Sequence, residues 1–218
     1  MIPRISEVHV RWIIAELIGT LLLTVTIGVT AIGGELYLNL YRSLYSPLLI
    51  GLVITVLVYL FGSVSGAHFN PAVTISLWVV RKIKHEQLVI YVVSQIVGAY
   101  VGLRLVKLLL GTAPQFSGVT TSAAMLAEAM GAFVLVLAVT SVVIGRVSES
   151  LSGLVIGLAL VIGISIALIP SGGVLNPAVA LSLGAIHFVY LLAPIVGGIC
   201  GAVLAVVIGG SEEEKAKV

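Results

Sequence analysis

Six long apolar stretches dominate the pattern of hydrophobic and polar positions along the chain. Each holds about 20 mostly apolar residues, the length that a helix needs to cross the hydrocarbon core of a bilayer. Short polar segments such as RKIKHEQ, GTAPQFSG and RVSES separate the stretches. The pattern predicts membrane-spanning helices at residues 11–32, 46–64, 88–110, 123–145, 151–169 and 187–209.

Two further apolar pieces are too short to span a membrane. They run from Asn70 to Val80 and from Asn176 to Ala185. At ~1.5 Å per residue they would reach about 16 Å and 15 Å, which together match one hydrocarbon core of about 30 Å. Asn is a preferred residue before a helix and Pro is favoured at the first helical position. Each piece is therefore expected to be half of a membrane helix.

The chain repeats one unit. Ala-Glu opens the first and fourth spans, and an Asn-Pro-Ala follows Glu16 by 54 residues and Glu128 by 48. We expect one domain over residues 1–218, with repeats at about 10–111 and 123–209. Each repeat contains three spans, an odd number, so the second copy must enter the membrane from the opposite face. The two half-helices would then start near the midplane, from opposite sides.

The residues at these two starts form the candidate site. The motifs SGAHFNPAV and SGGVLNPAV surround them. Irregular backbone at membrane depth is tolerated where it is buried in protein or lines a water-filled cavity. We therefore expect peptide carbonyls of the preceding loops to line a pore, at Gly66, Ala67 and His68 and at Gly172, Gly173 and Val174. The motifs themselves would form its centre, at Asn70, Pro71, Ala72, Asn176, Pro177 and Ala178.

Composition supports a membrane class. Hydrophobic residues make up 60% of the chain and charged residues 9%, against about a quarter in soluble domains. The partner is therefore expected to be the lipid bilayer, and the net charge of +2 gives no reason to expect nucleic acid. No nucleophile–base pair, phosphate loop or metal-ligand spacing is present, so we expect no enzyme activity, no cofactor and no metal.

Positive charges predict the orientation. Lys and Arg gather on the cytoplasmic side of membrane proteins. In a six-span arrangement three positive residues fall toward one side and eight toward the other. The eight are Arg4, Arg11, Arg81, Lys82, Lys84, Arg146, Lys215 and Lys217. We expect a multi-pass protein of the cell membrane with both termini cytoplasmic, and a disordered tail at 211–218.

The two Asn-Pro-Ala loops, the two Ala-Glu motifs and the six spans resemble the aquaporin and glycerol-facilitator family. The resemblance covers about residues 10–210. It implies an all-α membrane fold with six transmembrane helices, two re-entrant half-helices and inverted three-span repeats. It also implies a homotetramer with one pore in each subunit.

The resemblance places four filter residues near the outer mouth, at Ile50, Ile164, Gly173 and Val179. Water-selective members usually have an aromatic residue, a His and an Arg at the first, second and fourth of these positions. This chain lacks all three, so the constriction has no side-chain donor. Glycerol-selective members usually place Asp where this chain has Ala180. We therefore expect a passive channel for water and small neutral solutes (ammonia, hydrogen peroxide, urea and glycerol) that excludes ions. A water-selective channel is the alternative.

Glu16 and Glu128 admit two interpretations. A carboxylate inside a membrane span is costly and usually marks function, so the pair would suit a proton-coupled secondary transporter. The family resemblance favours the other interpretation, in which each carboxylate accepts hydrogen bonds from the re-entrant loop of its own repeat. A structural role without conduction is a further alternative.

Overall fold

The computed structural model describes residues 6–37, 45–114, 116 and 118–209. The predicted tail at 211–218 lies outside these residues, as does part of the first interhelical segment. Every regular element in the described part of the chain is helical. The long helices are α1 (Glu7–Tyr37), α2 (Tyr45–Ser65), α4 (His85–Leu110), α5 (Ser122–Val143), α6 (Ser152–Ser171) and α9 (Ala193–Gly209). The short ones are α3 (Pro71–Val79), η1 (Glu149–Leu151), α7 (Pro177–Leu183) and α8 (Phe188–Leu191).

Six segments of the described chain are long and apolar enough to cross a membrane. They correspond to the six spans predicted from the sequence. α1 extends beyond the predicted 11–32 at both ends, because helical hydrogen bonding continues where the apolar pattern stops. Large apolar side chains are exposed on these helices, among them Leu52, Leu60, Val93 and Val207. Such a surface suits contact with lipid.

The sixth span, predicted at 187–209, runs from Phe188 to Gly209 and has a local irregularity at Leu192. Helix α8 ends at Leu191 and α9 begins at Ala193. The physical reason is Pro194, which has no N–H for the carbonyl four residues earlier and whose ring crowds it. Helical hydrogen bonding resumes at once, since the N–H of Val196 donates to the carbonyl of Leu192 at 2.9 Å.

The two halves of the molecule use the same packing. Helix α1 packs along α4, and α5 packs along α9. At each crossing a glycine lets the backbones approach closely. A Cβ on Gly98 would collide with the carbonyl of Leu17, and one on Gly197 with the carbonyl of Ala129. Leu17 and Ala129 each follow the Glu of their repeat, so the halves match residue by residue at these crossings.

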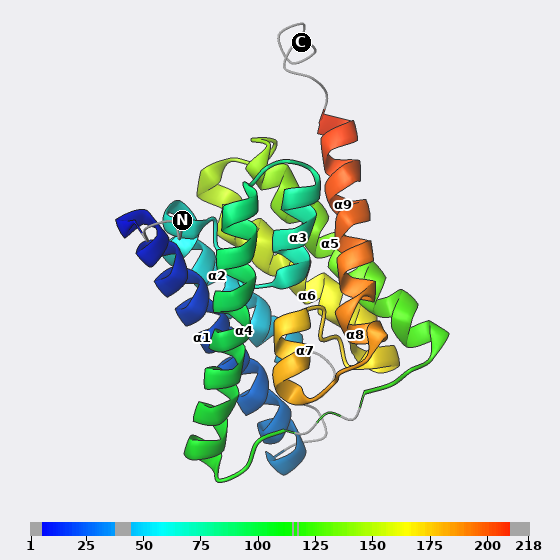
Figure 1. Ribbon diagram of the computed structural model, residues 1–218. Coiled ribbons are helices and arrows are strands. Elements are labelled where there is room, and N and C mark those ends of the chain that lie inside the picture. The colour runs from blue at the N-terminus through cyan, green and yellow to red at the C-terminus, as the bar shows by residue number, and fades with distance from the viewer. Residues whose placement is uncertain (1–5, 38–44, 115, 117, 210–218) are drawn as a thin grey trace, which may run out of the picture.

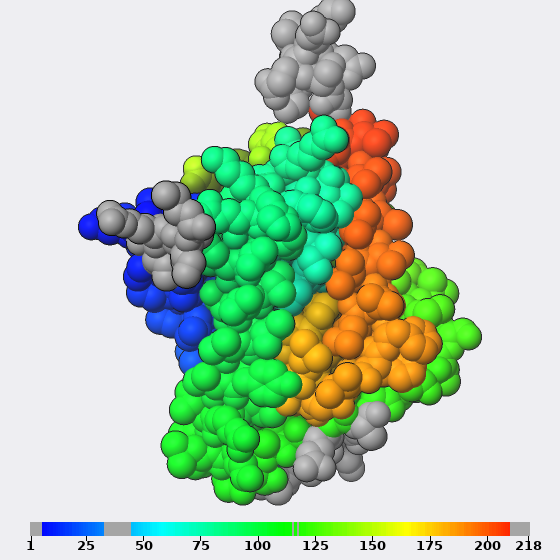
Figure 2. All heavy atoms as spheres, in the orientation of Figure 1, coloured from blue at the N-terminus to red at the C-terminus, as the bar shows by residue number. Residues whose placement is uncertain are grey.

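The half-helices α3 and α7 lie one above the other in the middle of the bundle (Figure 1). Helix α3 packs against α4 and α9, and α7 packs against α4. Figure 2 shows them filling the space between α4 and α9 on this face of the molecule. Helices α2 and α6 pack against each other and join the two halves. This arrangement brings the starts of α3 and α7 to the interior.

Candidate channel site

The half-helices begin at the two Asn residues of the Asn-Pro-Ala motifs. Both Asn residues have extended backbone and precede a Pro at the first helical position. The Oδ1 of Asn70 accepts from the N–H of Ala72 at 2.8 Å, and the Oδ1 of Asn176 accepts from the N–H of Ala178 at 3.1 Å. Each Asn thus satisfies a backbone donor that a helix start would otherwise leave unpaired.

The same two side chains join the half-helices to each other. The Nδ2 of Asn70 donates to the carbonyl of Leu175 at 3.0 Å, and the Nδ2 of Asn176 donates to the carbonyl of Phe69 at 2.9 Å. The acceptor is in each case the residue before the other Asn. The structure therefore brings residues 70 and 176 together, with both helix starts directed at one region.

Glu16 supports the first re-entrant loop. Its carboxylate accepts from two backbone N–H groups, of His68 at 3.0 Å and of Phe69 at 2.7 Å. It also accepts from the Oγ of Ser65 at 2.6 Å and the Nε2 of Gln95 at 2.8 Å. The side chain is fully buried. Within the described residues these four donors occupy about as many positions as an ionised carboxylate has lone pairs.

Glu128 supports the second loop in the same way. Its carboxylate accepts from the N–H groups of Val174 at 2.9 Å and Leu175 at 2.7 Å, and from the Oγ of Ser171 at 2.6 Å. These contacts hold a strained backbone, because Leu175 has a φ of 51° and its counterpart Phe69 a φ of 50°. A non-glycine residue in this region costs about 1–3 kcal/mol. The charge-assisted hydrogen bonds to the carboxylates offset this cost.

Two tyrosines brace these loops and were missed in the sequence. The hydroxyl of Tyr91 donates to the carbonyl of Ser65 at 2.7 Å, and that of Tyr190 donates to the carbonyl of Ser171 at 3.0 Å. A signal was present, since Tyr91 stands seven residues before Gly98 and Tyr190 stands seven before Gly197, the glycines at which α4 and α9 cross the Glu-bearing helices. That spacing could have identified them as equivalent positions of the repeat.

The first half has a polar network that the second half lacks. The Nε2 of Gln95 also donates to the hydroxyl of Thr74 at 2.9 Å, and this hydroxyl lies 3.1 Å from the Nδ1 of His68. The hydroxyl of Thr74 donates to the carbonyl of Asn70 at 3.1 Å. The network thus links Glu16 to the first re-entrant loop and to Asn70. Counterparts in the second half are Val174, Ala180 and Pro194, none of which has a polar side chain.

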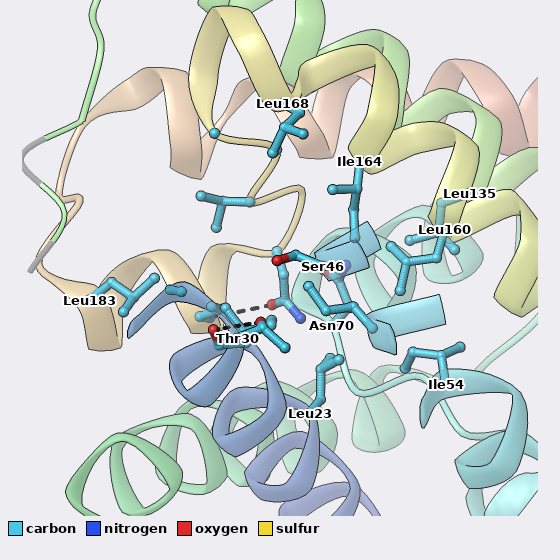
Figure 3. Close-up of a pocket in the computed structure, with 18 of the residues that line it drawn as sticks. Leu23, Thr30, Ser46, Ile54, Asn70, Leu135, Leu160, Ile164, Leu168 and Leu183 are labelled. Atoms are coloured by element: carbon cyan, nitrogen blue, oxygen red, sulfur yellow. Dashed lines mark hydrogen bonds between the residues drawn. The ribbon is translucent and has the colours of Figure 1, made fainter. Parts of the chain in front are cut away.

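A cavity of about 920 Å³ runs along the meeting point of the half-helices. Both Asn residues line it, together with apolar side chains of α1, α2, α5 and α6 (Figure 3). Five of the six loop residues expected from the sequence also line it, while Gly66 does not. The five are Ala67, His68, Gly172, Gly173 and Val174. Among the described residues no group donates a hydrogen bond to the carbonyls of these five residues.

The four expected filter residues all line this cavity. Ile50 and Ile164 come from α2 and α6, Gly173 from the second loop and Val179 from α7. Gly173 is in contact with Ile164, because a Cβ on the glycine would lie 2.9 Å from the carbonyl oxygen of Ile164. None of the four side chains can donate or accept a hydrogen bond. Glu16 and Glu128 are not part of the described cavity wall.

Comparison with known proteins identifies the family. A sequence model described as major intrinsic protein matches residues 4–205, nearly the whole chain. This chain belongs to the major intrinsic protein family. The family expected from the two signature loops is therefore confirmed.

Individual relatives agree with this assignment. Nodulin-26 of Glycine max is 32% identical over 210 residues, covering 91% of this chain and 78% of that protein. Glycerol uptake facilitator protein-like 6 of Lactiplantibacillus plantarum is 36% identical over 183 residues, covering 74% and 83%. The X-ray structure of the aquaglyceroporin from Plasmodium falciparum matches with a TM-score of 0.66 and 26% identity, covering 90% of this chain and 94% of that one.

These matches confirm the predicted fold class, six spans with two re-entrant half-helices. The major intrinsic protein family consists of membrane channels of the aquaporin and aquaglyceroporin type, not of enzymes. The protein is therefore a multi-pass membrane protein built as a channel for small solutes.

Proposed function

We propose that this channel passively conducts water and small neutral solutes, including ammonia, hydrogen peroxide, urea and glycerol, and excludes ions. The observation that carries the proposal is the chemistry of the cavity wall. Ile50, Ile164, Gly173 and Val179 line the same cavity as the two Asn side chains, and all four lack a hydrogen-bonding side chain.

An apolar constriction changes what passes easily. A water molecule that crosses it loses hydrogen-bond partners, and an unsatisfied polar group costs on the order of 1–3 kcal/mol. A solute with some apolar surface loses fewer hydrogen-bond partners there. Val179 is also smaller than the Arg that water-selective relatives usually have at this position, and Gly173 has no side chain. The constriction thus favours a broad range of neutral solutes over selectivity for water.

Ion exclusion is proposed to depend on the half-helices. Each helix start carries roughly half a positive charge, and both are directed at the region of Asn70 and Asn176. A cation at this point would meet two positive helix ends and the amide N–H groups of the Asn side chains. It would also have to lose water molecules of its hydration shell beside an apolar wall that offers no side-chain groups to replace them.

The buried carboxylates fit a structural role better than proton coupling. Glu16 is saturated with donors, and neither Glu16 nor Glu128 belongs to the described cavity wall. A transported proton would have no direct route to them from the solute pathway. We therefore favour a passive channel over a proton-coupled transporter.

We further propose that the protein is a homotetramer in the cell membrane with both termini in the cytoplasm. The start of α1 and the end of α9 lie at the same end of the bundle (Figure 1). The α3–α4 and α5–α6 connections lie at that end too, and they carry Arg81, Lys82, Lys84 and Arg146. This charge distribution supports a cytoplasmic assignment for that side.

A solute panel in proteoliposomes tests the function. Purified protein is reconstituted, and shrinkage and re-swelling are followed by stopped-flow light scattering in gradients of sucrose, urea and glycerol. We expect urea and glycerol to enter faster than in empty liposomes, without saturation and without dependence on a pH gradient. Water flux without any urea or glycerol flux would contradict the proposed solute range, and saturable, proton-dependent uptake would contradict a passive channel.

A further inference from the structure

Helices α1 and α4 run side by side and begin at the same end of the bundle (Figure 1). They approach closely where Gly98 of α4 meets Leu17 of α1, since a Cβ on this glycine would collide with the carbonyl of that leucine. Between this crossing and the first turns of the two helices lies a groove of about 310 Å³, the α1–α4 groove. It is separate from the solute pathway, because no residue that lines it also lines the central cavity.

The wall of the α1–α4 groove is almost entirely apolar. Its residues are Ile13, Leu17, Val89, Ile90, Val93, Ser94 and Val97. The hydroxyl of Ser94 donates to the carbonyl of Ile90 at 2.8 Å, so its hydrogen is directed at the helix backbone and not at a ligand. Val89, Val93 and Val97 are about half exposed. A polar solute would find no side-chain donor here, whereas an alkyl chain would bury apolar surface.

The α1–α4 groove has the length of one lipid leaflet. Both helices are long and apolar enough to span a membrane. From Val89 to Val97 a helix rises about 12 Å, and half of the hydrocarbon core is about 15 Å deep. Val89 lies one turn inside the start of α4 at His85, so the groove begins close to the membrane surface. A lipid acyl chain in this leaflet can therefore lie along it.

Two polar side chains meet at the surface end of the groove. The Nε2 of His9 lies 3.1 Å from the Oε1 of Glu86. His9 precedes Ile13 by four residues and Glu86 precedes Ile90 by four, so both lie on the helix faces that form the groove. The N–H of Ser6 donates to the Nδ1 of His9 at 3.2 Å. The proton of the neutral imidazole is therefore on Nε2, which donates it to Glu86.

The second carboxylate oxygen of Glu86 is free to accept. Among the described residues no group donates to its Oε2, and the side chain is 49% exposed. Lys84 precedes Glu86 by two residues and is also exposed. A carboxylate and an ammonium thus stand at the membrane surface next to an apolar groove. Charges of both signs suit a zwitterionic headgroup, whose own ammonium pairs with the carboxylate and whose phosphate pairs with the lysine.

We propose that the α1–α4 groove is a binding site for a zwitterionic lipid with a primary ammonium, phosphatidylethanolamine. One acyl chain lies in the groove, and the ammonium donates to Glu86. Phosphatidylcholine has no N–H to donate and phosphatidylglycerol has no ammonium, so both bind more weakly. The lipid contacts both helices of the pair that is joined on its inner side by Glu16 and Gln95. The site goes beyond the proposed function, because it does not depend on which solutes the channel conducts.

Native mass spectrometry of the purified full-length channel tests this site, since it counts bound lipids and subunits in the same spectrum. The protein is titrated with phosphatidylethanolamine, phosphatidylcholine and phosphatidylglycerol of equal chain length. Val93→Trp fills the groove, and Glu86→Gln removes the charge while keeping the shape. The matched control is Val101→Trp, since Val101 is exposed on the same helix but lines neither the groove nor the central cavity.

We expect the wild type to bind phosphatidylethanolamine about fivefold more tightly than the other two lipids, the effect of one exposed charge-assisted hydrogen bond. Glu86→Gln should bind all three lipids about equally, because the carboxylate charge is lost while the groove remains. Val93→Trp should weaken the binding of all three by about fivefold or more, because the acyl chain is displaced. Val101→Trp should behave as the wild type.

Equal affinity of the wild type for the three lipids would overturn the inference, as would binding of phosphatidylethanolamine to Val93→Trp at the wild-type level. A changed number of subunits in Val93→Trp with unaltered lipid binding would show that a second copy of the chain covers the groove. If Val93→Trp fails to insert, Val97→Phe blocks the same groove and decides in its place. Solute flux in proteoliposomes is measured separately, so loss of the lipid site leaves the proposed function standing.

Discussion

Individual polar residues in this protein act mainly by satisfying backbone groups that the membrane leaves without water. Asn70 and Asn176 cap one half-helix and bond to the other, and Glu16 and Glu128 accept the N–H groups of strained loops. In a bilayer each such group would cost several kcal/mol if it were unpaired. The polar residues at the centre of the molecule thus make an irregular backbone stable at that depth.

The carboxylates should differ in their contribution to stability. Each carboxylate oxygen of Glu16 accepts from two donors, so the N–H₂ introduced by Glu16→Gln faces two donors in either orientation. Among the described groups, one oxygen of Glu128 accepts from a single donor, so the N–H₂ of Glu128→Gln can face one donor fewer. We expect both variants to lose stability, Glu16→Gln by about 1–3 kcal/mol more. Thermal unfolding in detergent, followed by circular dichroism, gives the comparison. Equal losses would show that the hydrogen bond from Gln95 contributes nothing.

The sequence predicts these residues only in part. The two Asn and two Glu residues are visible because they are polar, repeated and set in apolar spans. Thr74, Tyr91 and Tyr190 were missed, because a tyrosine or threonine in a helix has many potential partners and the fold decides among them. His9 and Glu86 carry no signal in the sequence as a pair, since their contact depends on how the first turns of α1 and α4 pack together.

Among the elements, the two half-helices can be predicted from their sequence, and glycines allow the close helix crossings. Each half-helix has an apolar length, a cap and a Pro that are visible in the sequence. The irregularity between α8 and α9 was not predicted, because Pro194 lies within a continuous apolar run and its effect depends on the local backbone. The length of α1 was underestimated, since polar residues at a membrane surface can remain helical.

A glycine at a crossing should tolerate no larger side chain. Gly197→Ala puts a methyl group onto the carbonyl of Ala129, so we expect a loss of about 1–3 kcal/mol. Gly62→Ala is the matched control, because its Cβ would meet only Val58 at 3.8 Å. That variant should be neutral or more stable by up to about 1 kcal/mol. Thermal unfolding of both variants tests the prediction, and similar behaviour in the two would contradict it.

On the scale of the whole molecule, two similar halves of opposite orientation enclose one pathway. The halves match in their carboxylates, tyrosines and glycine crossings, and they differ where the first half has a polar network and the second has apolar residues. The connections that follow α4 and α5 should then lie on opposite sides of the membrane.

Cysteine labelling tests this orientation. In a Cys200→Ser background, Ser148→Cys lies in the α5–α6 connection and Thr120→Cys in the α4–α5 connection, and both positions are exposed. We expect a membrane-impermeant maleimide to label Thr120→Cys in intact cells and Ser148→Cys only in inverted vesicles. Labelling of both from the same side would contradict the inverted arrangement.

The most direct test of the central claim is the permeability of Val179→Arg. The claim is that the constriction at Ile50, Ile164, Gly173 and Val179 decides what the channel conducts. Arg at position 179 would fill the constriction and add fixed donors, and Val179→Leu serves as a control for size alone. We predict that Val179→Arg lowers glycerol and urea permeability relative to water by about tenfold, with a smaller reduction in Val179→Leu. If Val179→Arg conducts glycerol and urea as the wild type does, the constriction does not lie at these four residues.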